Sequence, residues 1–149
     1  MRRRDFIKVI AVSVAWPLAA SAQQPEQMRR IGVLMNRSEG DPEGQPRLAA
    51  FRQALEQLGW KEGRNIRIDI RWGEDKMDLE RKYAAELVAL APDVILASGT
   101  MSVTEVQALS RKLAIVFAAV ADPVGAGFVE SMAHPGGNAT GFRFWQPNW

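Results

Sequence analysis

Three consecutive residues, Ser98-Gly99-Thr100, follow a short apolar segment and precede a helical pattern of apolar residues. Hydroxyl groups and free backbone N–H groups at a helix N-terminus suit a carboxylate, because the helix dipole favours negative charge there. The same residues also fit an ordinary structural role, since Thr100 or Ser102 is a good helix cap. The sequence leaves both roles, ligand contact and helix capping, open at this junction.

A second polar group follows the next apolar run, which covers residues 113–118. Asp122 comes shortly after this run and directly before Pro123. A carboxylate at this place would accept charge-assisted hydrogen bonds from an amine, whereas the alternative role is that of a turn residue before proline. A carboxylate site at residues 98–100 and an amine site at Asp122 together suit an amino-acid-like ligand.

Short apolar or alternating runs between turn signals predict the strands that position these groups. The predicted strands cover residues 31–36, 65–72, 94–97, 113–118 and 139–142. The run 65–72 alternates polar and apolar residues, which is typical of a strand near a sheet edge. Residues 113–118 are continuously apolar, as in a strand that is buried on both faces.

Helical periodicity predicts three helices between these strands, with Gly59 ending the first and Asp78 capping the second. They cover residues 46–58, 78–90 and about 102–112, and a short amphipathic segment follows at 124–132. Strands that alternate with helices indicate right-handed βαβ units. The fold class is therefore α/β, a three-layer Rossmann-like lobe with a mostly parallel sheet of about five strands. Such sheets bind ligands outside the carboxyl ends of their strands.

The first 22 residues have the three parts of a bacterial secretory signal peptide: a basic start, an apolar centre and an Ala-Ser-Ala ending. Arg3-Arg4-Asp5-Phe6-Ile7-Lys8 also resembles the twin-arginine consensus. We expect cleavage after Ala22, a flexible lead-in at 23–28 and a periplasmic mature chain. The alternative is a membrane anchor, but Pro17 interrupts an apolar run shorter than the ~20 residues that span a bilayer.

Composition excludes several function classes. The chain has 149 residues with 19 basic and 17 acidic ones; the predicted leader holds four basic residues and one acidic one, which leaves 15 and 16. A net charge near −1 gives a nucleic-acid partner no electrostatic support. The absence of cysteine excludes disulfides, thiol catalysis and an acylated lipoprotein cysteine.

Metal, cofactor and catalytic motifs are also missing from the sequence. His134 is the one histidine, it lies in a predicted turn before Pro135, and a metal site needs a cluster of ligands. Gly125-Ala126-Gly127 lacks the third glycine of a dinucleotide fingerprint. We expect no metal, no cofactor and no enzymatic activity. A small exported flavodoxin-like enzyme or cofactor-binding domain remains the alternative hypothesis.

Three motifs carry a resemblance to a known family. They are Phe51-Arg52-Gln53-Ala54-Leu55 with Leu58-Gly59-Trp60, Asp122-Pro123-Val124 with Gly127, and Pro135-Gly136-Gly137-Asn138-Ala139-Thr140-Gly141-Phe142. Between residues 28 and 142 the chain resembles the TrpX-like solute-binding proteins of ABC importers, which are periplasmic binding proteins. The resemblance implies two Rossmann-like lobes that trap a small polar solute between them and deliver it to an ABC permease in the inner membrane.

The resemblance also implies where the chain departs from its family. Residues 29–142 correspond to the N-terminal lobe, whereas 143–149 do not look like the family's continuation and are predicted to be an aberrant tail. The expected protein is a binding component truncated to one lobe, or a non-functional fragment. The ligand contacts implied by the resemblance are Asn36, Arg37 and Ser38, then Ser98, Gly99 and Thr100, and finally Asp122. Asn36 and Ser38 fit ordinary loop roles equally well.

Overall fold

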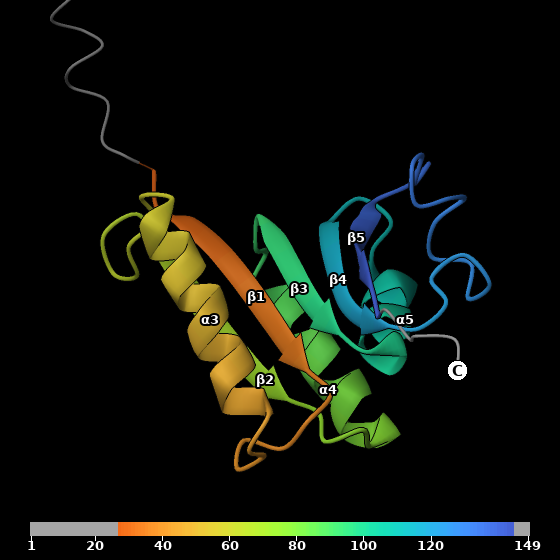
Figure 1. Ribbon diagram of the computed structural model, residues 1–149, viewed down its shortest axis with the longest axis horizontal. Helices are drawn as coiled ribbons and strands as arrows, with labels where there is room; N and C mark the ends of the chain where they lie inside the picture. The colour runs from red at the N-terminus through yellow and green to blue at the C-terminus, as the bar shows by residue number, and fades with distance from the viewer. Residues whose placement is uncertain (1–26, 145–149) are drawn as a thin grey trace, which may run out of the picture.

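The computed structural model describes residues 27–144, which form a five-stranded sheet with helices on both faces (Figure 1). All neighbouring strands pair in parallel, in the order β2-β1-β3-β4-β5. The strands are β1 (Arg29–Met35), β2 (Ile66–Trp72), β3 (Val94–Ser98), β4 (Ala114–Val120) and β5 (Ala139–Arg143). The predicted α/β class and the five parallel strands are confirmed. The predicted leader and most of the predicted tail lie outside the described residues.

The helices divide unequally between the two faces of the sheet. Helix α3 (Gly44–Gln57) crosses one face over β1 and β2, whereas α4 (Met77–Ala89) and α5 (Thr100–Leu109) lie behind the sheet in Figure 1. The result is the predicted three-layer arrangement. The carboxyl ends of the strands, with the loops that follow them, form the lower edge of the molecule in this view.

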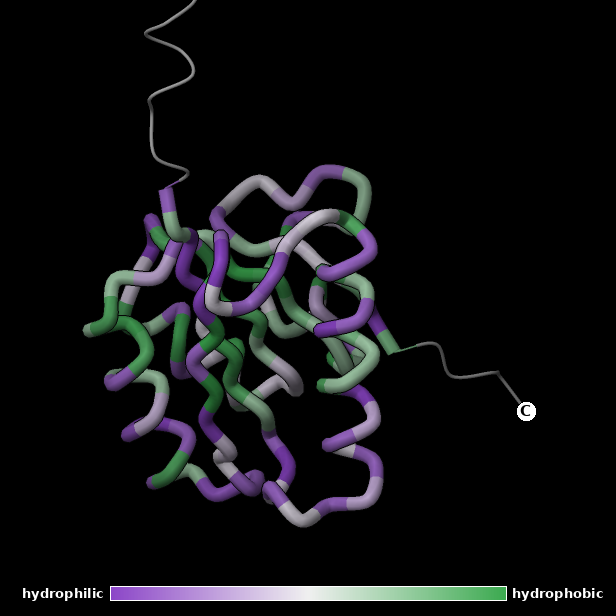
Figure 2. The backbone as a smooth tube through the Cα atoms, turned by 90° about the vertical axis from the view of Figure 1, so that its left-hand side faces the viewer, coloured by the Kyte–Doolittle hydropathy of each residue, from purple (hydrophilic) through white to green (hydrophobic). Residues whose placement is uncertain are grey.

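Alternation along β1 explains how one strand serves both layers. Ile31, Val33 and Met35 pack with Leu48 on the α3 side, whereas Leu34 belongs to the larger cluster under α4 and α5. Successive side chains of a strand point to opposite faces, so this division follows directly from the sequence. Figure 2 shows the longest hydrophobic stretches in the middle of the molecule, where the central strands lie.

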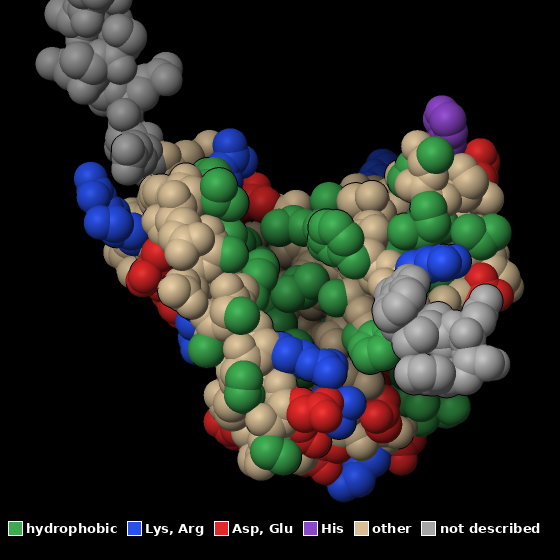
Figure 3. All heavy atoms as spheres, in the orientation of Figure 1, with side chains coloured by type: hydrophobic (Ala, Val, Ile, Leu, Met, Phe, Trp, Pro, Cys, Tyr) green, Lys and Arg blue, Asp and Glu red, His purple; other side chains and the backbone are tan. Residues whose placement is uncertain are grey.

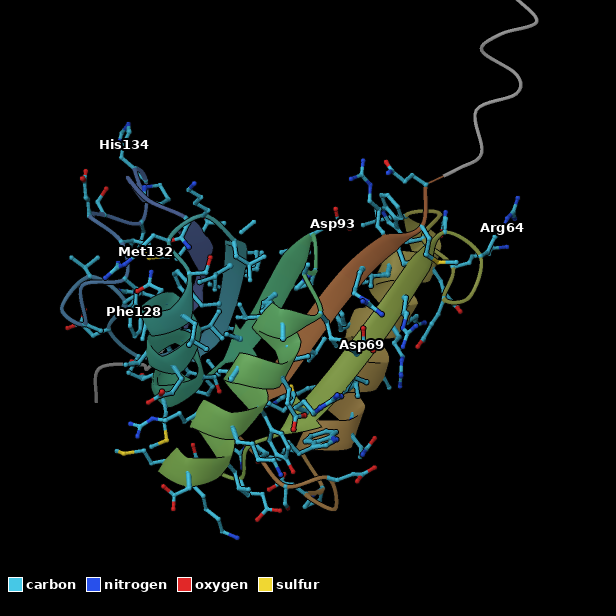
Figure 4. The ribbon with its side chains drawn as sticks, turned by 180° about the vertical axis from the view of Figure 1, so that it is seen from behind. Arg64, Asp69, Asp93, Phe128, Met132 and His134 are labelled. Carbon is cyan, nitrogen blue, oxygen red and sulfur yellow. The ribbon has the colours of Figure 1, made fainter. Side chains whose placement is uncertain are left out.

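Strand β2 occupies the sheet edge that its alternating pattern predicts. Asp69 on β2 pairs with Arg30 on β1 at 3.1 Å. Arg30 also donates its backbone N–H to Asp93, just before β3, at 2.8 Å. Figure 4 shows Asp69 on β2 and Asp93 just before β3, with β1 between these two segments. These polar contacts join three chain segments at the half of the molecule opposite the strand carboxyl ends.

Two predicted helix caps are wrong. Lys76, not Asp78, occupies the N-cap of α4, and no side chain caps that helix. Gly99 occupies the N-cap of α5, again without a side-chain cap. The hydroxyl of Ser102 instead bonds to a carboxylate on α4. Pairing between helices therefore overrides the local capping preference of Ser102.

The segment after β4 includes the short amphipathic stretch 124–132. Residues 123–127 form turns, and no helix covers 124–132. Strand β4 continues to Val120, and its pairing with β5 shifts register between Phe117 and Val120. Gly141 on β5 fits there because a Cβ at this position would collide with the backbone of Phe117. His134 lies exposed at the tip of the turn region, pointing away from the sheet (Figure 4).

On the α3 face, the sheet over β3, β4 and β5 forms an apolar groove of about 500 Å³. Figure 3 shows this hollow at the centre of the view, with hydrophobic side chains on its floor and walls. Phe142 is 76% exposed beside it. The residues that line this apolar groove are Met35, Arg47, Leu48, Phe51, Leu96, Ser98, Val116, Ala118, Ala119, Phe142 and Phe144. Among residues 27–144, none of the helices has the length and apolar character needed to cross a bilayer.

Candidate functional site

The candidate site is built where β1 and β3 end side by side. Asn36 is the first residue after β1 and Ser98 is the last residue of β3. The buried Ser98 hydroxyl donates a hydrogen bond to Oδ1 of Asn36 at 3.2 Å. The parallel register of β1 and β3 brings these two side chains to one edge. The structure therefore brings together two residues from separate predicted parts of the site.

A third strand end contributes Asp75, which the sequence analysis missed. Nδ2 of Asn36 donates a hydrogen bond to Oδ1 of Asp75 at 3.2 Å. Asp75 reaches this place because it and Glu74 both adopt left-handed backbone conformations, with φ of 52° and 59°. The turn after β2 lies at the same edge as the loops after β1 and β3. Parallel strands have their carboxyl ends at the same edge of a sheet. This rule could have drawn attention to Asp75, because it follows a predicted strand.

Gly99 places the first turn of α5 against this network. Its φ of +90° is the left-handed region that favours glycine. A Cβ at Gly99 would also lie only 2.8 Å from Nδ2 of Asn36. The Gly99 N–H donates to the carbonyl of Ala118, near the end of β4. Glycine is therefore required here both by backbone conformation and by close packing.

Thr100 begins α5 and is exposed at its N-terminus. Because no side chain caps the helix, the backbone N–H groups of its first turn are available to an anion such as a carboxylate. The Thr100 carbonyl accepts a hydrogen bond from the Thr104 hydroxyl at 2.9 Å, inside the helix. The helix terminus next to Ser98 and Asn36 thus fits the carboxylate site predicted from the sequence.

Arg37 and Ser38 lie outside this network. Arg37 forms ion pairs with Asp41 at 3.4 Å and Glu43 at 3.1 Å. Hydrogen bonds from the backbone N–H groups of Glu43 and Gly44, together with Arg37, hold the pKa of Asp41 below its usual range, against a smaller opposing effect of burial. Ser38 is exposed, and its carbonyl accepts the Asp41 N–H. The loop after β1 is therefore closed on itself by its own charges.

The side chain of Asp122 makes a contact within its own turn. Oδ1 of Asp122 accepts the Gly125 N–H at 2.8 Å, and the residue is exposed. A Cβ at position 125 would collide with the same carboxylate, so glycine fits there. The turn role weighed for Asp122 is present in the structure. Its predicted contact with a ligand amine stays a prediction.

A second residue missed by the sequence analysis is Glu80, which lies on α4 close behind the site. It is completely buried, and its Oε2 accepts the Ser102 hydroxyl at 2.8 Å. Burial is the main cause that raises the pKa of Glu80 to about 7. The sequence contained a signal for the burial of Glu80. Its spacing from Ala84 and Leu87 places all three residues on one face of the helix.

Metal ligands do not gather in the described part of the chain. No three His, Cys, Asp or Glu side chains among residues 27–144 are grouped closely enough to hold an ion. The chemistry that the edge offers is recognition of charged and hydrogen-bonding groups: an uncapped helix N-terminus, the hydroxyl of Ser98, the amide of Asn36 and the carboxylate of Asp75.

Comparison with known proteins defines the class to which this fold and edge belong. Residues 43–145 match the family described as ABC transporter substrate binding protein, and the chain belongs to that family. The "Tyrosine-binding protein" of Clostridioides difficile (strain R20291) is 37% identical over 91 residues, which are 61% of this chain and 26% of that protein.

Solved structures of substrate-binding proteins share the fold. The ligand-free, open structure of a substrate binding protein with adhesive properties from Clostridium difficile has a TM-score of 0.71 and 30% identity, covering 76% of this chain and 38% of that one. An ABC domain in complex with L-Trp from Streptococcus pneumoniae has a TM-score of 0.72 and 26% identity, covering 78% and 39%. This chain therefore spans about a quarter of the curated relative's length and under two fifths of either solved chain.

Proposed function

We propose that this chain is the solute-binding lobe of the substrate-binding component of an ABC importer and that it takes an amino-acid-like solute. The observation that carries the proposal is the junction of Asn36, Ser98 and Asp75 beside the uncapped N-terminus of α5. A zwitterion carries one negative and one positive group. The helix N-terminus suits its carboxylate, and the carboxylate of Asp75 suits its ammonium group. The relatives described as tyrosine-binding and as a complex with L-Trp support the same class of solute.

In this proposal the solute carboxylate lies at the first turn of α5, against the N–H groups that follow Gly99 and the hydroxyls of Ser98 and Thr100. The solute ammonium group lies toward the carboxylates of Asp75 and Asp122. Asn36 joins the carboxylate-binding part of the site to the ammonium-binding part, because its amide accepts a hydrogen bond from Ser98 and donates one to Asp75. Arg37 and Ser38 shape the neighbouring loop instead of contacting the solute directly.

The proposal assigns a transport role without chemical conversion of the solute. The predicted periplasmic location, the delivery of solute to a permease in the inner membrane and the absence of enzymatic activity all follow the family to which the chain belongs. One lobe provides one wall of a cleft. For residues 27–144 by themselves we expect weak binding, because a ligand held on one side keeps much of its surface in water.

Isothermal calorimetry with matched ligands tests the proposal. L-tryptophan and L-tyrosine are titrated beside tryptamine and indole-3-propionate, which lack the carboxylate and the ammonium group respectively. We expect heat of binding with the amino acids and a substantial loss with either analogue, because each removes one charge-assisted contact. A Ser98→Ala variant should weaken binding, whereas Thr104→Val, on an exposed part of α5, should not. Equal binding of tryptamine and L-tryptophan would contradict the carboxylate site.

A further inference from the structure

Glu80 has a buried carboxyl group that lies between the turn after β2 and the first turn of α5. Both of these segments contribute to the candidate site. Glu80 projects from α4 with no solvent exposure. Oε2 accepts the hydroxyl of Ser102, in the first turn of α5, at 2.8 Å. Oε1 is buried and has no hydrogen-bond partner in the described part of the chain. A buried oxygen without a partner has a free-energy cost, and that cost rises sharply when the group carries a charge.

The turn after β2 lies directly over this carboxyl group. A Cβ at Gly73 would collide with the Glu80 carboxyl, so the missing side chain of Gly73 makes room for it. The Gly73 N–H donates to the carbonyl of Met35 at 2.7 Å, and the Lys76 N–H donates to the carbonyl of Gly73 at 3.0 Å. The 73–76 turn is thereby fastened to the end of β1 while it covers Glu80.

The charged groups that face Glu80 oppose its ionisation. Burial has the largest effect and raises the pKa of Glu80 to about 7, and the negative charges of Asp75 on the turn and Glu105 on α5 raise it further, against the Ser102 hydrogen bond, which lowers it. The nearby cations are engaged elsewhere. Arg81 pairs with Glu105 at 3.4 Å, and Lys76 pairs with Glu74 at 2.6 Å.

We propose that Glu80 is a positioning residue that holds the candidate site in its binding geometry while protonated and loosens the 73–76 turn when it ionises. The inference rests on the proposed function. It adds that solute binding is controlled by a single proton and weakens as pH rises through neutrality. The contacts that transmit the change are the hydrogen bond that the Asn36 amide donates to Asp75 and the hydrogen bond that Asn36 accepts from the Ser98 hydroxyl.

The physical reason is the poor environment of the ionised form. The buried carboxylate has one hydrogen bond and lies beside two other negative charges. Its free energy therefore falls when water reaches it. The turn over Oε1 is the part that can move, because it consists of a glycine and two residues in left-handed conformations rather than a packed helix. Movement of this turn displaces Asp75 and removes one anchor of Asn36. The two strand ends are then no longer fixed to each other.

A pH titration of the full chain by NMR tests the conformational part. The amide signals of residues 73–76 and 98–101 and the Asn36 side-chain amide should shift together, with a midpoint near the Glu80 pKa of about 7. Glu80→Gln should abolish the transition. Ser102→Ala should raise the midpoint, and Asp75→Asn should lower it. Glu86→Gln is the matched control, because Glu86 is a half-buried residue of the same helix that pairs with Arg71, and it should leave the midpoint unchanged.

Persistence of the transition in Glu80→Gln, or its absence in the unmodified chain, would overturn the inference. Calorimetry with L-tryptophan and L-tyrosine then separates it from the proposed function. If only the protonated form binds, affinity should be about tenfold weaker one pH unit above the midpoint than one unit below it, and constant in Glu80→Gln. Binding without this pH dependence contradicts the inference and leaves the proposed function standing. Absence of binding at every pH contradicts the proposed function, while the NMR titration still decides whether Glu80 moves the turn.

Discussion

At the residue scale, Asn36 joins three strand ends with one side chain. Its amide donates to Asp75 and accepts from Ser98, both at 3.2 Å. An amide is suited to this task because it offers a donor and an acceptor on opposite sides. The contacts explain why Gly99 has to come so close, since Asn36 fills the space that a side chain at position 99 would occupy. The geometry of the site therefore depends on a few specific residues.

Gly99→Ala should destabilise the chain more than Gly59→Ala. Both glycines have nearly the same positive φ, 90° and 89°, but a Cβ at Gly59 meets nothing within 4 Å. The Gly59 variant reports the backbone strain alone, roughly 1 kcal/mol. The Gly99 variant adds the collision with Asn36 and a ψ of 157°, in a backbone region that is adopted almost only by glycine, so we expect a total loss of about 2–3 kcal/mol. Urea unfolding of the two variants measures the difference, and equal losses would contradict the added cost at Gly99.

The raised pKa of Glu80 predicts how the free energy of unfolding depends on pH. Its pKa rises from 4.5 to about 7 on folding. A raised carboxyl pKa gives stability that is fully present below 4.5 and is lost as pH rises through about 7. The shift corresponds to about 3 kcal/mol. The free energy of unfolding should therefore fall by about this amount from pH 4.5 to pH 8, relative to Glu80→Gln, in urea titrations at each pH. Parallel pH profiles of the two proteins would refute the buried carboxyl account.

At the element scale, the strands were predictable because burial imposes a strong pattern. The runs at 94–97 and 113–118 are continuously apolar since β3 and β4 lie inside the sheet, and β2 alternates because it is an edge. The helix starts were less predictable. Ser102 has the chemistry of a cap, but the buried Glu80 binds its hydroxyl. That contact joins residues 22 positions apart on separate helices, which a local pattern does not reveal.

The turn after β2 shows the same limit for the candidate site. Ser98, Gly99 and Thr100 were predictable because a strand-to-helix junction has a local signature. Asp75 was missed because its role depends on two left-handed residues in succession and on a partner 39 positions away. Arg37 was predicted as a contact on the family resemblance alone. Its ion pairs with Asp41 and Glu43 turn it toward its own loop.

Strand β5 should depend on Gly141. A Cβ there would collide with the Phe117 backbone on β4, so Gly141→Ala should disrupt the pairing of the two strands. We expect a loss of more than about 2 kcal/mol together with faster hydrogen exchange in residues 139–143. Gly137→Ala is the control, because a Cβ at Gly137 meets no atom within 4 Å. Unchanged exchange in the Gly141 variant would contradict the close approach.

At the scale of the whole molecule, helices cover the two faces of the sheet unequally. Among residues 27–144, α3 crosses one face and α4 and α5 cross the other (Figure 1), which leaves the apolar groove over β3, β4 and β5. Parallel sheets normally have both faces covered. An open apolar surface of this kind is a liability for a protein in water. The chain spans only part of the length of its relatives, and this groove is an apolar surface that is open to solvent in the described residues.

The groove should bind hydrophobic dyes. Phe142→Ser should reduce the fluorescence of bound anilinonaphthalene sulfonate and reduce light scattering, because Phe142 lines the groove. Leu58→Ser is the matched control, since both side chains belong to residues that are 76% exposed but Leu58 does not line the groove. Stability should change by less than about 0.5 kcal/mol in both variants. Equal dye binding by both variants would show that the groove is not the site of dye binding.

The central claim is that the strand ends around Ser98 and Gly99 bind an amino-acid-like solute. Chemical-shift mapping of the isotopically labelled chain during titration with L-tryptophan and L-tyrosine tests it most directly. The account predicts saturable shifts for the Asn36 side-chain amide and for the amides of residues 75 and 98–101, with little change at the opposite edge around Asp93. Shifts confined to the parts of the apolar groove on α3, β4 and β5, or no saturable shift with either amino acid, would contradict the account.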